Sequence, residues 1–198
     1  MNSNERNMTE DGIIISSRLL LRKVRYTDEA QVFDIFSNQQ VTEHYDCHTF
    51  TAQIEAHKWL QWNQALYKQK GLGGFRWAIT LIEDPCIMIG SCGIHTLNPQ
   101  FHSLEIGYEL HPDYWGQGIM TEALKVMIQM CFDENFPIIL NRITAITHLQ
   151  NNASINVLNK LGFQEEGVLR EYGFWKEEYH TVRLFSLLKH DWLIPTIE

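Results

Sequence analysis

The stretch SLEIGYELHPDYWGQGIMTEALKVMIQMCF, residues 103–132, predicts a strand, a loop with two glycines and a helix in direct succession. Polar and apolar side chains alternate through residues 103–110, with the period of two that is typical of a strand with one polar face. The apolar set is Leu104, Ile106, Tyr108 and Leu110. Residues 111–113 end the strand, and apolar side chains at helical spacing then predict a helix over 119–132.

The loop between strand and helix carries Gly116 and Gly118. Glycine lets the chain turn tightly and lets a ligand approach the backbone. The first N–H groups of a helix lack partners and the helix dipole is positive there, so this junction suits an anion such as a pyrophosphate. No Gly-Lys-Ser/Thr follows and a third glycine is missing, which excludes a Walker loop and the full dinucleotide fingerprint. A glycine-rich turn before a core helix is the alternative interpretation.

A second segment, HLQNNASINVLNKLGF at 148–163, predicts a short helix over 151–161. Asn151 and Asn152 are natural N-cap residues, and Ser154 would lie in the first turn. Gly162 is typical of a helix C-cap.

The rest of the chain mixes helices and strands. Residues 13–24 predict a first strand or strand pair, and two helices follow before a turn at 73–74. Further strands are expected at 75–82, 87–96, 142–147, 163–169 and 179–189. This order predicts an α/β or α+β fold with a mixed central sheet flanked by helices. We expect a single domain over residues 13–193, behind a flexible leader of residues 1–12.

Composition excludes several classes of function. The chain has 198 residues, with 16 Lys and Arg against 24 Asp and Glu, a net charge of −8. This excess of acid argues against direct nucleic-acid binding and against an anionic membrane surface. Neither the four cysteines nor the nine histidines show metal-ligand spacing, so we expect no metal site and reduced thiols. The polar N-terminus and the lack of a long apolar run predict a cytoplasmic protein.

The two motifs EIGYELHPDYWGQGIMTEAL (105–124) and NNASINVLNKLGF (151–163), taken in this order, resemble the GNAT superfamily of N-acetyltransferases. LLLRKVRYTDE (19–29) and YHTVRLFSLLKHDW (179–192) are similar to the first and last strands of one branch, which contains the ribosomal-protein N-terminal alanine acetyltransferases. The resemblance covers about residues 16–193. It implies a central sheet splayed open beside the third central strand, with acetyl-CoA in the V-shaped cleft and its pyrophosphate on the loop before the helix.

The resemblance also implies which residues bind acetyl-CoA, with residues 115–121 as the pyrophosphate loop. Gly118 matches the central glycine of the family signature, whereas Trp115 replaces the usual Gln or Arg and Met120 the usual Gly or Ala. Asn151 matches an Asn that bonds the pantetheine arm. The cofactor-binding residues expected are Leu110, Trp115, Gly116, Gln117, Gly118, Ile119, Met120, Thr121 and Asn151.

The implied reaction is direct transfer of an acetyl group to a primary amine. An α-amine has a pKa of about 7.7–8 and a lysine amine about 10.4, so an N-terminal substrate needs only a modest base. Glu105 is our candidate for this base, with Glu109 or water alone as alternatives. Ser154 matches a Ser placed near the thioester sulfur, and a backbone N–H near Leu110 would donate to the oxyanion. Leu158 stands where many members have a tyrosine acid, which excludes that acid here.

The sequence thus predicts an acetyl-CoA-dependent N-acetyltransferase with a ribosomal-protein-like N-terminal α-amine as acceptor. A small amine such as a polyamine or aminoglycoside is an alternative acceptor. A CoA-binding module without turnover is the alternative from a different class. The acceptor's identity and a homodimer both stay open.

Overall fold

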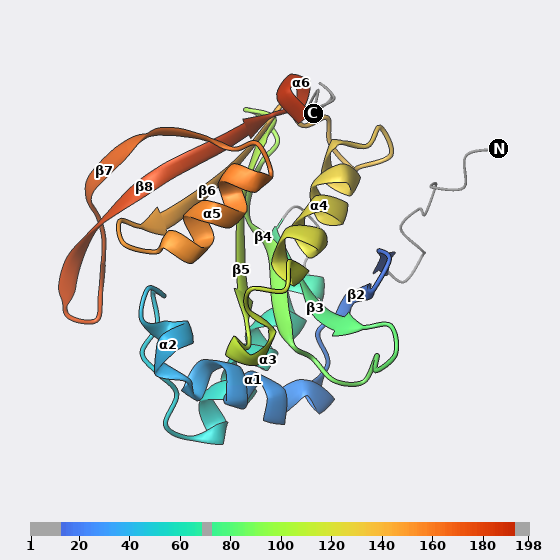
Figure 1. Cartoon of the computed structure of the whole chain (residues 1–198), viewed down its shortest axis with the longest axis vertical. Helices are drawn as coiled ribbons and strands as arrows, with labels where there is room; N and C mark the ends of the chain where they lie inside the picture. The colour runs from blue at the N-terminus through green and yellow to red at the C-terminus, as the bar shows by residue number, and fades with distance from the viewer. Residues whose placement is uncertain (1–12, 69–72, 193–198) are drawn as a thin grey trace.

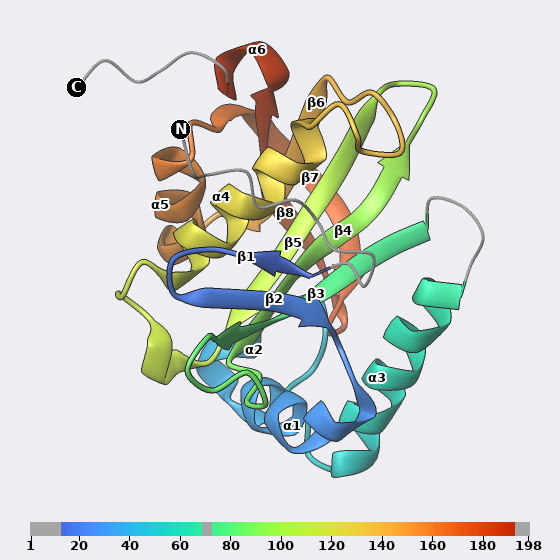
Figure 2. The same ribbon diagram turned by 90° about the vertical axis from the view of Figure 1, so that its right-hand side faces the viewer.

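The computed structural model describes residues 13–68 and 73–192, and they form one eight-stranded sheet with helices on both faces (Figures 1 and 2). The strands are β1 (Ile14–Ile15), β2 (Leu19–Lys23), β3 (Gly73–Leu81), β4 (Gly90–Asn98), β5 (Ser103–Leu110), β6 (Arg142–His148), β7 (Gln164–Trp175) and β8 (Glu178–Leu188). The helices are α1 (Glu29–Ser37), α2 (Gln39–Thr42), α3 (Gln53–Lys68), α4 (Ile119–Phe132), α5 (Asn152–Lys160) and α6 (Lys189–Trp192). Short 3-10 turns cover Tyr26–Asp28 and Pro112–Tyr114.

The sheet forks between two of its central strands. The strand order is β1-β2-β3-β4-β5-β6-β8-β7, and all neighbours are antiparallel except β5 and β6. These two parallel strands pair only from Ser103–Glu105 to Arg142–Thr144, although β5 continues to Leu110 and β6 to His148. Their later halves therefore separate, which confirms the predicted mixed sheet that is splayed open beside the third central strand.

Two hydrophobic cores hold the helices against the sheet. Helices α4 and α5 cover one face of the sheet, and α1 and α3 cover the other (Figures 1 and 2). In α4 the buried side chains recur at helical spacing, and they pack with the apolar side of β5 in the larger core. They are Ile119, Met120, Ala123, Leu124, Met127, Ile128, Cys131 and Phe132. The smaller core joins α1 and α3 to the sheet through Phe36, Leu60 and Ala78.

The strand at 103–110 and the helix at 119–132 have the predicted bounds. The predicted turn at 73–74 is wrong, because both glycines belong to β3, where Gly73 pairs with Thr96 of β4. A Cβ at Gly74 would lie 2.5 Å from the Ile94 carbonyl oxygen, so this glycine allows close approach of two strands. The leader at 1–12, residue 193 and the predicted end of the second helix near residue 71 lie outside the described residues.

The last hairpin is longer than predicted. β7 continues from Leu169 to Trp175, past an irregularity of register at Leu169–Gly173 where Glu171 has φ of 49°. Such a bulge breaks the period-two pattern from which a strand is recognised. Over the described residues, no helix is long and apolar enough to cross a membrane.

Candidate active site

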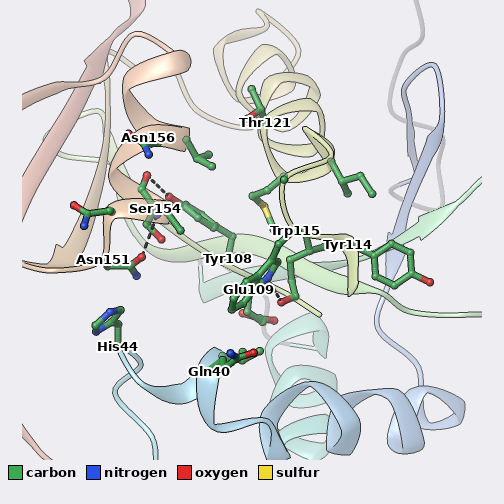
Figure 3. A pocket seen from close by; sticks show the side chains of 18 of the residues that line it. Gln40, His44, Tyr108, Glu109, Tyr114, Trp115, Thr121, Asn151, Ser154 and Asn156 are labelled. Atoms are coloured by element: carbon green, nitrogen blue, oxygen red, sulfur yellow. Dashed lines mark hydrogen bonds between the residues drawn. The ribbon is translucent and has the colours of Figure 1, made fainter. Parts of the chain in front are cut away.

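A cleft of about 610 Å³ lies where β5 and β6 separate (Figure 3). Four parts of the chain line it: the end of β5, the loop and first turn of α4, the start of α5, and the segment around α2. The predicted residues among the lining are Leu110, Trp115, Gly116, Gly118, Ile119, Met120, Thr121, Asn151 and Ser154. Two predicted residues, Gln117 and Glu105, do not line the cleft. The fold therefore brings both sequence motifs to one cavity.

The glycine loop opens directly onto the start of α4. Gly116 and Gly118 have φ of 72° and 74°, in the left-handed region that glycine adopts without strain. Gly118 is the N-cap and offers no side chain to the first turn, so the first N–H groups of this 14-residue helix have no acceptor within the helix. With the positive end of the helix dipole, they form a site suited to an anion.

The side chain of Trp115 holds the glycine loop against β5. Its indole Nε1 donates a hydrogen bond of 2.8 Å to the carbonyl of Leu110, which ties the loop back to the end of β5. Met120, which is bulkier than the residue usual in the family signature, is only 7% exposed and packs in the larger core. Neither Trp115 nor Met120, the two departures from the family signature, closes the cleft.

The end of β5 presents a backbone donor to the cleft. The N–H of His111 donates to Ile89 just before β4, and successive N–H groups of an extended chain point to opposite edges. The N–H of Leu110 therefore points toward the open fork. The Leu110 carbonyl, on that same edge, accepts the hydrogen bond from Trp115 in the cleft. This N–H stays our candidate for the oxyanion donor near Leu110.

The start of α5 places two polar side chains in the cleft. Asn151 is the N-cap, and its Oδ1 accepts a hydrogen bond of 3.1 Å from the N–H of Ser154 (Figure 3). Because the cap uses the oxygen, the Nδ2 amino group of Asn151 stays available to a ligand. The Ser154 side chain lies beside the Tyr108 hydroxyl, with which it forms a hydrogen bond. Capping and ligand binding by Asn151 are therefore compatible.

Tyr108 was not among the candidates, because its place on the apolar side of β5 indicates a core residue. Its ring reaches into the cleft, and its hydroxyl donates a hydrogen bond of 3.3 Å to the carbonyl of Ser154 (Figure 3). Burial raises the pKa of Tyr108 well above its ordinary value, so the phenol stays protonated. The Gly107-Tyr108 pair beside the cleft was the signal that could have pointed to it.

Glu109 lies at the cleft but is fully engaged. Its side chain is 1% exposed and forms a buried ion pair with Arg76. The Oε2 also accepts from the hydroxyl of Tyr45, and Oε1 accepts from the hydroxyl of Ser91. With both oxygens occupied, this carboxylate anchors the end of β5 to β3, β4 and the segment around α2.

Glu105 has a different environment on the same side of β5. It lies at the closed end of the fork, where its Cα is paired with that of Thr144. Partial burial raises the pKa of Glu105 above its ordinary value, and within the described residues its oxygens have no hydrogen-bond donor. Glu105 thus has unengaged oxygens, whereas those of Glu109 are occupied, but it stands back from the cleft.

The segment around α2 forms the other side of the cleft. Gln40, His44 and Tyr45 line it, and Figure 3 shows Gln40 and His44 facing Glu109 and Asn151 across the cavity. The His44 ring stacks on His148 at the end of β6, with 5.0 Å between centroids. The Nζ of Lys176, in the β7–β8 turn, donates to the carbonyls of Thr42 and Glu43. The hairpin and α2 thus enclose this end of the cleft together.

The described residues hold no group of three or more His, Cys, Asp or Glu side chains arranged to bind a metal ion.

Comparison with known proteins assigns the chain to a family. Residues 18–164 match the family described as "Acetyltransferase (GNAT) domain". The chain belongs to the GNAT acetyltransferase family. The uncharacterized N-acetyltransferase YoaA of Bacillus subtilis (strain 168) is 33% identical to this GNAT acetyltransferase over 177 residues, which cover 89% of this chain and 97% of YoaA.

Two further similarities concern ribosomal acetyltransferases. YdaF of Bacillus subtilis (strain 168), a putative ribosomal N-acetyltransferase, is 31% identical over 105 residues, 53% of this chain and 56% of YdaF. The structure of RimL, a ribosomal L7/L12 α-N-protein acetyltransferase in complex with coenzyme A, superimposes with a TM-score of 0.76. It is 22% identical, and the match covers 89% of this GNAT acetyltransferase and 97% of RimL. At this identity, the similarity to RimL shows that the two chains share a fold.

The two functions of Asn151 can be separated by mutation. Asn151→Asp keeps an oxygen for the cap but removes the amino group, so we expect unchanged stability and weaker binding of CoA. Asn151→Ala should lose both the cap and the contact with CoA. Loss of the cap should lower the free energy of unfolding by about 0.5–2 kcal/mol. Thermal unfolding and calorimetric titration with CoA measure the two effects.

Asn152→Ala is the matched control, because Asn152 is the exposed neighbour and its side chain is not the cap. Equal losses of CoA affinity at 151 and 152 would show that Asn151 acts only as a cap.

Proposed function

We propose that this GNAT acetyltransferase transfers the acetyl group of acetyl-CoA to the α-amine of a protein N-terminus. The observation that carries the proposal is the cleft itself, which runs from the N–H groups of α4 to the enclosed end beside α2. One end suits a pyrophosphate and the other admits an acceptor. The names of YdaF and RimL support a ribosomal-protein-like N-terminus as acceptor.

The residues of the cleft fit acetyl-CoA, which supplies an activated acetyl thioester. The N–H groups of residues 118–121 would hold the pyrophosphate, and the Asn151 amino group would hold the pantetheine arm. The N–H of Leu110 would donate to the acetyl oxygen, where negative charge develops during transfer. The loop residues Trp115, Gly116 and Gln117 would shape this site.

The acceptor must lose a proton to become a nucleophile. An α-amine, with a pKa of about 7.7–8, is roughly a tenth neutral at pH 7, so a weak base acting through water suffices. Glu105 is the proposed base because its pKa is raised and its oxygens are free. Glu109 is not, because Arg76, Tyr45 and Ser91 occupy both of its oxygens.

Two hydroxyls stand where the CoA thiolate would leave. Ser154 places its hydroxyl in the cleft, and the protonated phenol of Tyr108 lies beside both the carbonyl and the side chain of Ser154. We assign the hydrogen bond to the thiolate to Ser154. A thiol has a pKa of about 8.5 and leaves readily, so this hydrogen bond assists the transfer without controlling it.

Ser154→Ala should therefore lower the rate of thiol release by about tenfold, below the usual 10²–10⁴ contribution of a general acid. Acetyl-CoA affinity and thermal stability should hold, since the Asn151 cap bonds the Ser154 backbone. A thiol-release assay with an accepted amine measures the rate. An unchanged rate would transfer the role to Tyr108, which Tyr108→Phe tests directly.

Glu105→Gln should lower the rate at pH 7 and recover as the pH rises. The reason is that the wild-type carboxylate accepts the amine proton, and above the pKa of the amine the solvent has already taken it. Because the pKa of Glu105 is raised, the wild-type rate should begin to fall at a higher pH than an ordinary Glu would give. A pH profile of thiol release that matches wild type would remove Glu105 as the base.

The acceptor class is tested with a panel of amines. N-terminal peptides that have no lysine, the same peptides with blocked α-amines, and polyamines and aminoglycosides are each mixed with acetyl-CoA, and acetylated products are identified by mass spectrometry. We expect products only from peptides with free α-amines. Products only from the small amines would contradict the proposed acceptor.

A further inference from the structure

Outside the cleft, Glu122 in the first turn of α4 accepts four hydrogen bonds from the turn between β1 and β2. The hydroxyls of Ser16 and Ser17 donate to Oε1 at 2.7 and 2.9 Å. Arg18 donates its backbone N–H to Oε1 at 3.1 Å and its Nε to Oε2 at 2.7 Å. Partial burial acts to raise the pKa of Glu122, but these hydrogen bonds outweigh it and lower the pKa to about 2. Glu122 therefore stays a carboxylate at any pH near neutrality.

The same arginine also holds the cofactor loop. The Nη2 of Arg18 donates a hydrogen bond of 3.1 Å to the carbonyl of Gln117, between the two left-handed glycines. In a trans peptide the C=O and the following N–H point in opposite directions. Because the Gln117 carbonyl is held on the outside by Arg18, the N–H of Gly118 is turned the other way. Gly118 lines the cleft and Gln117 does not, which agrees with this orientation.

The turn that presents Arg18 is fixed independently of the loop. The N–H of Ser16 donates to the Leu19 carbonyl, and the N–H of Leu19 donates to the Ser16 hydroxyl, both at 3.0 Å. The Arg18 carbonyl accepts from the N–H of Ile82, beyond the end of β3. Gln117 lies between two glycines, whose backbone angles are less restricted than those of other residues. The β1–β2 turn thus supplies a fixed reference for the glycine loop.

We propose that the turn Ser16–Arg18, with Glu122, is a positioning element that holds the Gly118 N–H toward the acetyl-CoA pyrophosphate. Arg18 is the positioning residue, and it acts through the Gln117 carbonyl. This inference rests on the proposed function, since it requires that acetyl-CoA binds in this cleft. It extends the cofactor site to a turn about a hundred positions away in the sequence.

The test measures the Kd of acetyl-CoA and the thermal stability of the free protein for four variants. We expect Arg18→Met to weaken binding roughly tenfold, which corresponds to about 1.4 kcal/mol. Glu122→Gln should weaken binding in the same direction, because it releases Arg18. With an accepted amine, KM for acetyl-CoA should rise while kcat holds.

Arg18→Lys separates positioning from mere stability. A lysine can pair with Glu122, but its single ammonium lacks the planar fork that reaches two acceptors at once. We expect Arg18→Lys to keep the melting temperature of wild type but to bind acetyl-CoA as weakly as Arg18→Met. Arg142→Met is the control, because it removes a comparable exposed ion pair with Glu166 far from the loop; it should leave the Kd unchanged.

Three results would overturn the inference. The first is a wild-type Kd in Arg18→Met, and the second is full recovery of affinity in Arg18→Lys. The third is a loss for Arg18→Met with acetyl-CoA that vanishes with acetyl-dephospho-CoA, which would mean direct contact with the 3′-phosphate. If wild type itself fails to bind acetyl-CoA, the proposed function falls with it, and that result is distinct from the other three.

Discussion

Gly118→Asp should abolish measurable binding of acetyl-CoA while leaving the protein folded. Gly118 is the N-cap of α4 with φ of 74°, so an Asp there should cost about 1–2 kcal/mol of backbone strain, which leaves a domain of ordinary stability folded. The added Cβ would stand 3.8 Å from the Nη2 of Arg18, so the carboxylate would draw Arg18 from the Gln117 carbonyl and put a negative charge beside the pyrophosphate. At an effective dielectric of about 20, two unit charges about 4 Å apart repel by roughly 4 kcal/mol, which exceeds a hundredfold in Kd. Calorimetric titration and thermal unfolding measure the two properties.

Gly118→Asn is the matched control for shape and backbone strain. Asn has nearly the same size as Asp, adopts the left-handed region more easily than most residues, and carries no charge. A Cβ at Gly118 would meet only the Nη2 of Arg18, at an ordinary contact of 3.8 Å. We therefore expect Gly118→Asn to bind acetyl-CoA within a few fold of wild type. Normal binding by Gly118→Asp would show that the loop is not the cofactor site.

Arg76→Met should be the most destabilising of the substitutions considered. Arg76 is 3% exposed, and its guanidinium pairs with Glu109 while also bonding the hydroxyl of Ser91 and the Nε2 of His95. Its loss leaves a buried carboxylate without its counter-charge, at a cost of about 3–5 kcal/mol. For a chain of this size, each kcal/mol corresponds to about 2–4 °C in melting temperature. Chemical unfolding measures the change.

Two further measurements identify the cause. Burial and the neighbouring charge of Arg76 lower the pKa of His95 to about 4. An NMR titration of Arg76→Met should therefore show a higher pKa for His95. Arg183→Met removes the exposed ion pair with Glu165 and should cost at most about 1 kcal/mol. If Arg76→Met costs no more than this control, the buried network does not hold β5 in place.

The core of the fold was predictable where one continuous segment carries the whole signal. The alternation in residues 103–110 and the helical spacing in 119–132 are local properties, and both elements appear with the expected bounds. The continuation of β7 was not predictable, because the irregularity around Glu171 interrupts its alternation. The strand position of Gly73 and Gly74 depends on pairing with β4, which local sequence does not reveal.

The candidate site shows the same limit more clearly. Glycines before a helix predict an anion site from local sequence, whereas the ligand role of Asn151 is implied only by the resemblance to the GNAT family. The engagement of Glu109 could not be predicted, since its partners Tyr45, Arg76 and Ser91 come from three distant segments. The contact between Arg18 and the loop likewise exists only because β2 and α4 meet in the fold.

The most direct test is release of CoA thiol by wild type as a function of both acetyl-CoA and an N-terminal peptide, with Gly118→Asp as the blank. We predict release that saturates with each substrate, yields peptide acetylated on its α-amine, and disappears in Gly118→Asp. Binding of acetyl-CoA to wild type with no release above the blank for any peptide, polyamine or aminoglycoside would contradict catalysis. The cleft would then belong to a CoA-binding module without turnover.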